Sequence, residues 1–272
     1  MRTFIIAVGL WLLALPVWAD ARTTVLVDVL RLGELAEILQ REGLENAEQL
    51  DRDMLGGQGG PGWELQVRAI YSPERIVETV RTALQIALMG QEREDVIRFF
   101  AQGTGAQIIA LENEARAAIT DPEIEEAARA RLSDLDGTAD ARLAQITALI
   151  DSGDMVERNV AAAMNSNFQF MRGMSDGNAL QMTEAEMLAD VTQQHDAVSE
   201  DTRSWLYSYL ALAYSPLEDD ALERYIAFSK TDAGRSLNSA LFEGVRSSLR
   251  GRVLCPWACR GAEHGRRRPI AS

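Results

Sequence analysis

The residues whose types and spacing could bind a ligand are aromatic side chains in the C-terminal third of the chain. They are Trp205, Tyr209, Tyr214, Tyr225 and Phe228. Trp205 and Tyr209 lie four residues apart, so they share one face of a predicted helix. Such a set packs as an aromatic core whose hydroxyl groups find partners at its edge. The alternative is a cavity lined for a small apolar ligand. We favour the packed core and keep the cavity as the second hypothesis.

No catalytic set accompanies these aromatic residues. His195 is the single histidine before the C-terminal tail, and its polar neighbours TQQHDAV are typical of a surface position. The methionine-rich stretch 155–187 places Met and Phe on one helical face, which favours core packing over a Cu(I) site. The Gly-rich stretch 56–62 lacks the ending of a phosphate-binding loop. We therefore expect a protein that is not an enzyme and that uses no cofactor and no metal ion.

Two further groups of residues mark predicted corners between helices. Phe99 precedes Gly105 by six positions, and 129 residues later Phe228 precedes Gly234 by the same interval. Thr231 stands between the second pair as a helix cap. A glycine at such a corner lets two backbones approach closely, where a side chain would clash. The four positions and Thr231 are therefore expected to be structural.

A second motif repeats along with the corners. Tyr-Ser-Pro occurs at 71–73 and again at 214–216, at an offset of 143 residues rather than 129. The two offsets disagree, so a duplication requires an insertion in the first half. The sequence thus suggests two degenerate helical repeats.

The elements that must hold these residues are predicted to be helices throughout. We expect an amphipathic helix over 25–41 that ends at Gly43, and one long helix from 183 to about 214. Two capping boxes mark helix starts, at Thr183-x-x-Glu186 and at Ser215-x-x-Glu218. No segment of useful length alternates as a strand does. The predicted fold class is all-α, a multi-helix array.

The composition limits the classes of partner. The chain of 272 residues has 41 acidic residues against 27 Lys plus Arg, a net charge of −14. This balance argues against binding nucleic acid or an anionic membrane, since both need clustered cations. Lys230 is the only lysine, and such an arginine bias usually follows GC-rich coding DNA. A bacterial source is the natural interpretation.

The two ends of the chain differ from the rest. Residues 1–19 have the layout of a cleavable signal peptide: one Arg, an apolar run over 4–15, and small residues before Asp20. The mature chain is predicted to have no membrane span and to be periplasmic. Residues 250–272 contain six Arg, one Glu and both cysteines, Cys255 and Cys259. We interpret this basic tail as disordered or as the product of a frameshift.

Between the ends, the predicted helical body covers 20–249. Its possible halves are 20–120 and 154–249, joined by a helical segment over 121–153. Within the second half, AYSPLEDDALERYIAFSKTDAGRSLNSALF at 213–242 resembles the C-terminal hallmark of the domain of unknown function 2059 family. The hallmark is an acidic helix start, an aromatic-rich helix and a Ser/Thr-x-x-Gly corner. Its places are filled here by Leu222, Tyr225, Phe228, Thr231 and Gly234.

The resemblance extends over most of the body. The stretches 96–129 and 154–177 also look like the larger proteobacterial members, so the likeness covers about 25–249. It implies a secreted helical protein of unknown activity, and it supplies no catalytic residues to carry over. The basic tail departs from the family pattern, which continues helically at this point.

Together these observations predict a secreted, soluble, helical protein of the periplasm that is not an enzyme. We expect an interaction or chaperone-like module whose partner is an unknown periplasmic protein. The alternative is a module that binds a small apolar ligand between the aromatic-lined helices.

Overall fold

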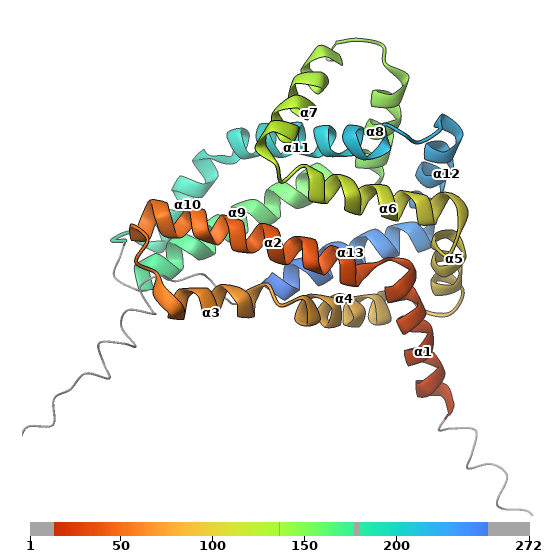
Figure 1. The fold of residues 1–272 in the computed structure, drawn as a ribbon, viewed down its shortest axis with the longest axis horizontal. Coiled ribbons are helices and arrows are strands. Elements are labelled where there is room, and N and C mark those ends of the chain that lie inside the picture. The colour runs from red at the N-terminus through yellow and green to blue at the C-terminus, as the bar shows by residue number, and fades with distance from the viewer. Residues whose placement is uncertain (1–13, 136, 177–179, 250–272) are drawn as a thin grey trace, which may run out of the picture.

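The computed structural model describes residues 14–135, 137–176 and 180–249, and the elements in these residues are all helical. The all-α prediction is therefore confirmed (Figure 1). In chain order the elements are α1 (Ala14–Val29), α2 (Leu32–Leu50), the π-helix η1 (Asp51–Leu55), α3 (Gly60–Ile70), α4 (Pro73–Ala87), α5 (Gly90–Phe100), α6 (Gly103–Ala118), α7 (Pro122–Leu135), α8 (Ala141–Ser152), α9 (Met155–Asp176), α10 (Glu184–Gln193), α11 (His195–Tyr214), α12 (Asp219–Ser229) and α13 (Asp232–Leu249).

Some predictions concern residues at the two ends of the chain that the structure does not describe. Residues 1–13 of the predicted signal peptide and the whole basic tail, with Cys255 and Cys259, are not among the described residues. Within the helices that the structure does describe, none combines the length and apolar character needed to cross a membrane.

One capping box is confirmed and the other is wrong. The Thr183 hydroxyl accepts the Glu186 amide, and the Glu186 carboxylate accepts the Thr183 amide at 2.7 Å, so α10 starts as predicted. Ser215 starts no helix, because α12 begins at Asp219 without a side-chain cap. The connection before α12 is instead held by Arg142 of α8, which donates to the carbonyls of Tyr214 and Leu217 at 2.9 and 2.6 Å.

Two predicted helices are interrupted. The helix expected over 25–41 is broken at Arg31, which adopts the left-handed conformation (φ 47°) between α1 and α2. Gly43 does not end a helix. It lies in the middle of α2, and a Cβ there would lie 2.4 Å from the Tyr71 ring, so the glycine makes room for Tyr71. The helix expected over 183–214 breaks at Gln194, where α10 gives way to α11.

Two apolar cores are shared between the predicted halves of the body. The first is built mainly by α1, α2, α4, α5 and α13, and the second by α6, α8, α9, α11 and α12. The C-terminal helix α13 runs along α4, and α6 runs along α11 (Figure 1). The segment over 121–153 is more than a connection, because α8 contributes Ile146, Leu149 and Ile150 to the second core. The halves thus interlock.

The interlocking follows a pattern of two similar helical triplets. In the first, α4 leads to α5 and then α6; in the second, α11 leads to α12 and then α13. Each third helix packs on the first helix of the other triplet, α13 on α4 and α6 on α11. Likewise α5 contacts α13 and α12 contacts α6. This exchange brings the two corners, α5–α6 and α12–α13, to the same end of the molecule (Figure 1).

Candidate functional site

The two corners have nearly the same backbone geometry. A Cβ on Gly105 would lie 2.1 Å from the carbonyl oxygen of Phe99, and a Cβ on Gly234 would lie 2.2 Å from that of Phe228. Since carbon and oxygen cannot approach so closely without a shift of backbone, both corners need a residue without a side chain. Thr231 caps the second corner, because its hydroxyl accepts the Gly234 amide at 3.1 Å.

The aromatic residues of the two corners meet face to face. The rings of Phe99 and Phe228 are stacked, with centroids 4.2 Å apart and planes inclined by 10°. Phe100, which is fully buried, presents its ring edge-on to both, at 5.0 and 5.5 Å. Stacked and edge-on aromatic pairs stabilise a structure beyond the burial of their apolar area. Because Phe99 and Phe100 belong to one triplet and Phe228 to the other, this cluster holds the two triplets together at the corners.

A surface cleft of about 760 Å³ lies between the corners. Its apolar wall is formed by Phe99, Phe228, Gly105 and Ala233, and polar side chains surround them. Those polar residues are Gln91, Glu92, Asp95, Arg98, Gln102, Thr104, Arg224, Thr231 and Asp232. The volume is in the range of small-molecule sites, which are mostly apolar with a few polar groups that orient the ligand.

The polar rim of the cleft is held by exposed ion pairs. Arg98 donates to the Asp95 carboxylate at 2.6 Å, and Gln91 donates to the same group at 2.8 Å. The hydrogen bonds from Gln91 and Arg98 hold the pKa of Asp95 below its ordinary value. Across the cleft, Arg224 of α12 donates to the Thr104 hydroxyl of α6 at 3.0 Å. The rim therefore includes a link between the two triplets.

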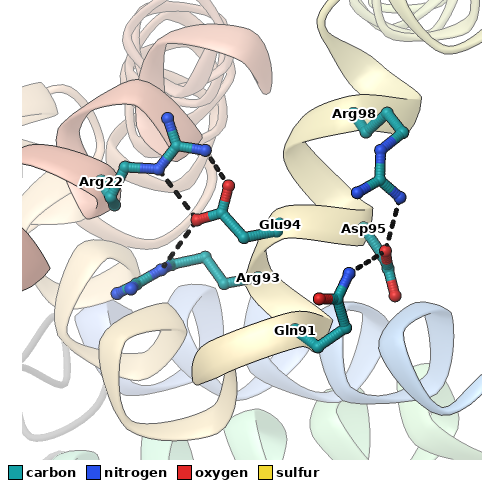
Figure 2. Close-up of polar contacts among 6 residues, drawn as sticks. All are labelled: Arg22, Gln91, Arg93, Glu94, Asp95 and Arg98. Carbon is teal, nitrogen blue, oxygen red and sulfur yellow. Dashed lines mark hydrogen bonds and ion pairs between the residues drawn. The ribbon is translucent and has the colours of Figure 1, made fainter.

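A different ion pair lies on the other side of α5. Figure 2 shows the Gln91, Asp95 and Arg98 group on one side of the helix and Arg22 with Glu94 on the other. Arg22 of α1 forms a two-pronged pair with the Glu94 carboxylate, which keeps the pKa of Glu94 below its ordinary value. This pair attaches α1 to α5 and takes no part in the cleft.

Behind the cleft, three tyrosines surround Glu112 of α6. The Tyr214 hydroxyl donates to the Glu112 carboxyl group at 2.6 Å, and the Tyr225 ring lies edge-on to the Tyr214 ring with centroids 6.3 Å apart. The Tyr209 hydroxyl donates to the Glu112 backbone carbonyl at 3.1 Å. Protein atoms around the carboxyl remove its hydration, and this raises the pKa of Glu112 to about 7 although the hydrogen bond from Tyr214 lowers it. Burial likewise raises the pKa of Tyr214 and Tyr225.

Trp205 continues this cluster toward α2. Its ring stacks on Tyr209 with centroids 5.3 Å apart, and the Arg116 guanidinium lies 4.9 Å from its centroid on the other side. Arg116 also forms a two-pronged pair with Glu42 of α2 at 2.6 and 2.7 Å. The arrangement ties α2, α6 and α11 together through one arginine.

The structure divides the predicted aromatic set. It brings Trp205, Tyr209, Tyr214 and Tyr225 together as packed side chains, and the hydroxyls of Tyr209 and Tyr214 donate to Glu112. It places Phe228 on the wall of the cleft, stacked on Phe99. His195 lies on the surface and contacts the adjacent Asp196 at 3.0 Å.

Glu112 is the residue that reasoning from the sequence missed. A signal was present, because Ile108, Glu112 and Ala115 follow one another at helical spacing, and the first and last are buried. That spacing puts a carboxyl group on the core face of α6. A glutamate on such a face requires a hydrogen-bond partner, and Tyr214 on a later helix is that partner.

Among the described residues, no three His, Cys, Asp or Glu side chains gather in a way that could hold a metal ion. Comparisons of the chain with protein-family models, with curated proteins and with solved structures found no match. The likeness to the domain of unknown function 2059 family therefore stays a prediction.

Proposed function

We propose that this protein is a secreted, non-enzymatic interaction module of the bacterial periplasm, and that its partner binds in the cleft between the two corners. The observation that carries the proposal is the stacked pair of Phe99 and Phe228 on the cleft wall. Both side chains are only half-buried although they are large and apolar. An apolar wall with a mixed-charge rim is the composition of a recognition site.

The shape of the surface favours a protein partner. The cleft is open and bounded by helix ends from both triplets, so an extended segment of a partner can lie across it. A second hollow of about 530 Å³ runs between α4 and α13, and Ile86 at its edge is 72 % exposed. Exposed apolar surface beyond the cleft suits a contact larger than one small molecule.

We propose a non-enzymatic role because of where Glu112 lies. Among the described residues it is the carboxyl with the most raised pKa, to about 7, and a raised pKa is often a sign of a catalytic group. Its carboxyl accepts a hydrogen bond from the Tyr214 hydroxyl, and Glu112 is not among the residues that line the cleft. We therefore assign it to the packing behind the site.

The alternative function is binding of a small apolar ligand in the same cleft. The volume of about 760 Å³ and the paired phenylalanine rings favour it. The two functions differ in what is bound, and the same protein sample tests both.

The experiment is photo-crosslinking in the periplasm combined with native mass spectrometry. A photo-reactive phenylalanine analogue replaces Gln102, which precedes α6 on the cleft rim, and in a control it replaces Gln107, an exposed glutamine of α6 outside the cleft lining. We expect one protein to be captured from position 102 and not from 107, and the capture to be lost when Phe228→Ala is added. Phe168→Ala, on α9, is the matched control for that loss.

The outcomes separate the hypotheses. A small-molecule mass on the full chain that disappears in Phe228→Ala, without protein capture, supports the alternative. Equal capture at positions 102 and 107, together with an unliganded mass, contradicts both functions.

A further inference from the structure

We propose that Glu112, Tyr214 and Tyr225 form a proton-sensitive link that sets the position of the aromatic wall of the cleft. The inference rests on the proposed function, because it concerns regulation of the same site. It assigns to the polar cluster behind the cleft a role beyond packing: a change in protonation of Glu112 moves the surface that the partner contacts.

The link is continuous from the carboxyl group to the cleft. The Tyr214 hydroxyl donates to Glu112 at 2.6 Å, and the Tyr214 ring lies edge-on to the Tyr225 ring with centroids 6.3 Å apart. Tyr225 stacks on Phe99 with centroids 6.2 Å apart and planes inclined by 21°. Phe99 in turn stacks on Phe228 at 4.2 Å. Tyr214 and Tyr225 thus connect the carboxyl group to the cleft wall.

The groups around Glu112 leave its own proton as the changeable charge. From α11 it faces Tyr209 and Tyr214, and from α12 it faces Tyr225; burial raises the pKa of all three phenols. The α5 residues in the cluster, Phe99 and Phe100, carry no charge.

An ion pair on the same helix belongs to another contact. Arg116, on the same helix as Glu112, is bound to Glu42 of α2 by two hydrogen bonds. With the pKa of Glu112 at about 7, the charge of the cluster changes close to neutral pH.

The two protonation states hold Tyr214 differently. An ionised carboxylate accepts the hydrogen bond from Tyr214, and such a charge-assisted bond is about twice as strong as a neutral one. A protonated carboxyl has to place its own O–H as well, and it binds the phenol more weakly. We therefore expect Tyr214, and with it the Tyr225 and Phe99 rings, to be held firmly above neutral pH and more loosely below it.

Fluorine NMR of the full chain tests the link without any ligand. 4-Fluorophenylalanine replaces Phe228 as the reporter of the cleft wall, and in a second sample it replaces Phe168 as a reporter outside the cleft. We expect the signal from position 228 to titrate with a midpoint near pH 7, and the signal from position 168 to stay constant over the same range. Glu112→Gln, which is neutral at every pH, should abolish the titration, whereas Glu114→Gln on the exposed side of α6 should leave it unchanged.

A second variant keeps the test decisive if Glu112→Gln does not fold. Tyr214→Phe retains the ring but removes the hydrogen bond that stabilises the anion. The midpoint should therefore rise by about one pH unit. A flat signal at position 228 in the wild-type chain, a titration that persists in Glu112→Gln, or an unmoved midpoint in Tyr214→Phe would each overturn the link. Failure of crosslinking at position 102 with an intact titration would instead count against the proposed function alone.

Discussion

The two corners of this protein have nearly the same backbone geometry but differ in their side chains. At both, a phenylalanine carbonyl lies against a glycine that has no room for a Cβ, and the separation in sequence is the same. They differ in their caps. Thr231 accepts a backbone amide in the second corner, whereas Gln102, its counterpart 129 residues earlier, makes no side-chain cap.

The difference extends into the helices that follow. Glu112 of α6 corresponds at the same offset to Leu241 of α13. Leu241 packs against the first apolar core, while Glu112 bonds to tyrosines in the second. The comparison shows that the close approach of the backbones determines the geometry of the corner. The residue two turns after the glycine can then be either an apolar side chain in a core or a titratable one.

The largest expected effect comes from closing the space at the corners. Gly105→Ala and Gly234→Ala should each lower the free energy of unfolding by about 3 kcal/mol, because the new methyl group meets backbone atoms that cannot rotate away. Urea denaturation followed by circular dichroism measures both. Similar losses at the two positions would confirm that the corners are equivalent.

Gly33→Ala is the matched control for these variants. It is also a helical glycine, but nothing lies within 4 Å of the position of its Cβ. There the substitution should stabilise the protein by about 0.5 kcal/mol or more, through helix propensity. If Gly105→Ala behaved like Gly33→Ala, the close approach at the first corner would be refuted.

The next largest effect is a pH dependence of stability, which we expect from Glu112 and not from Leu241, its counterpart after the other corner. The folded-state pKa of Glu112 is raised to about 7 from an ordinary value of 4.5, so the folded protein binds more protons between these values. Rising pH therefore lowers the free energy of unfolding, by about 2 kcal/mol between pH 5 and pH 8. This loss should be complete once the pH passes the folded-state pKa.

The measurement compares unfolding free energies of the wild-type chain and Glu112→Gln across that range. The slope should vanish in the variant. The pKa of Glu94 and of Asp95 is lowered rather than raised, so their contributions are lost only at more acidic pH, below the range used. A slope that survives in Glu112→Gln would mean that another group titrates.

Much of the fold could be predicted from local sequence. The Thr183 capping box and the helical spacing of apolar residues depend on neighbours within one or two turns, which the sequence displays directly. The breaks at Arg31 and Gln194 were missed, because each is decided by what the helices pack against rather than by a Gly or Pro. Gly43 was misinterpreted for the same reason, since its partner is Tyr71, 28 residues away.

The site was harder to predict than the fold. The sequence displayed the two Phe–Gly pairs, but not that Phe99 and Phe228 stack on each other, because that contact depends on the exchange of α6 and α13 between triplets. The tyrosines were recognised as a set, but their common partner Glu112 lies 97 residues before Tyr209. Such a polar contact between distant helices leaves no local pattern except a carboxyl on an apolar face.

A smaller effect should come from the difference between the caps. Thr231→Ala removes the hydroxyl that accepts the Gly234 amide and should cost about 1 kcal/mol of unfolding free energy. Gln102→Ala at the other corner should cost much less, because Gln102 has no cap to lose. Thermal unfolding of the two variants measures the difference, and equal losses would show that the caps do not distinguish the corners.

The smallest loss of stability should come from replacing the arginines on the cleft rim. These variants compare a contact within one triplet with a contact between the two triplets. Arg98 pairs with Asp95 on its own helix, whereas Arg224 reaches from α12 to the Thr104 hydroxyl of α6. Exposed ion pairs contribute little to stability and are screened by salt.

Arg98→Ala and Arg224→Ala should therefore both shift the thermal midpoint by less than Thr231→Ala does. Of the two arginines, only Arg224 links one corner to the other, so Arg224→Ala should have the larger effect. Part of that effect should persist in high salt, since Thr104 is neutral. A loss in Arg98→Ala that exceeds the loss in Arg224→Ala would show that the rim stabilises α5 alone and does not connect the triplets.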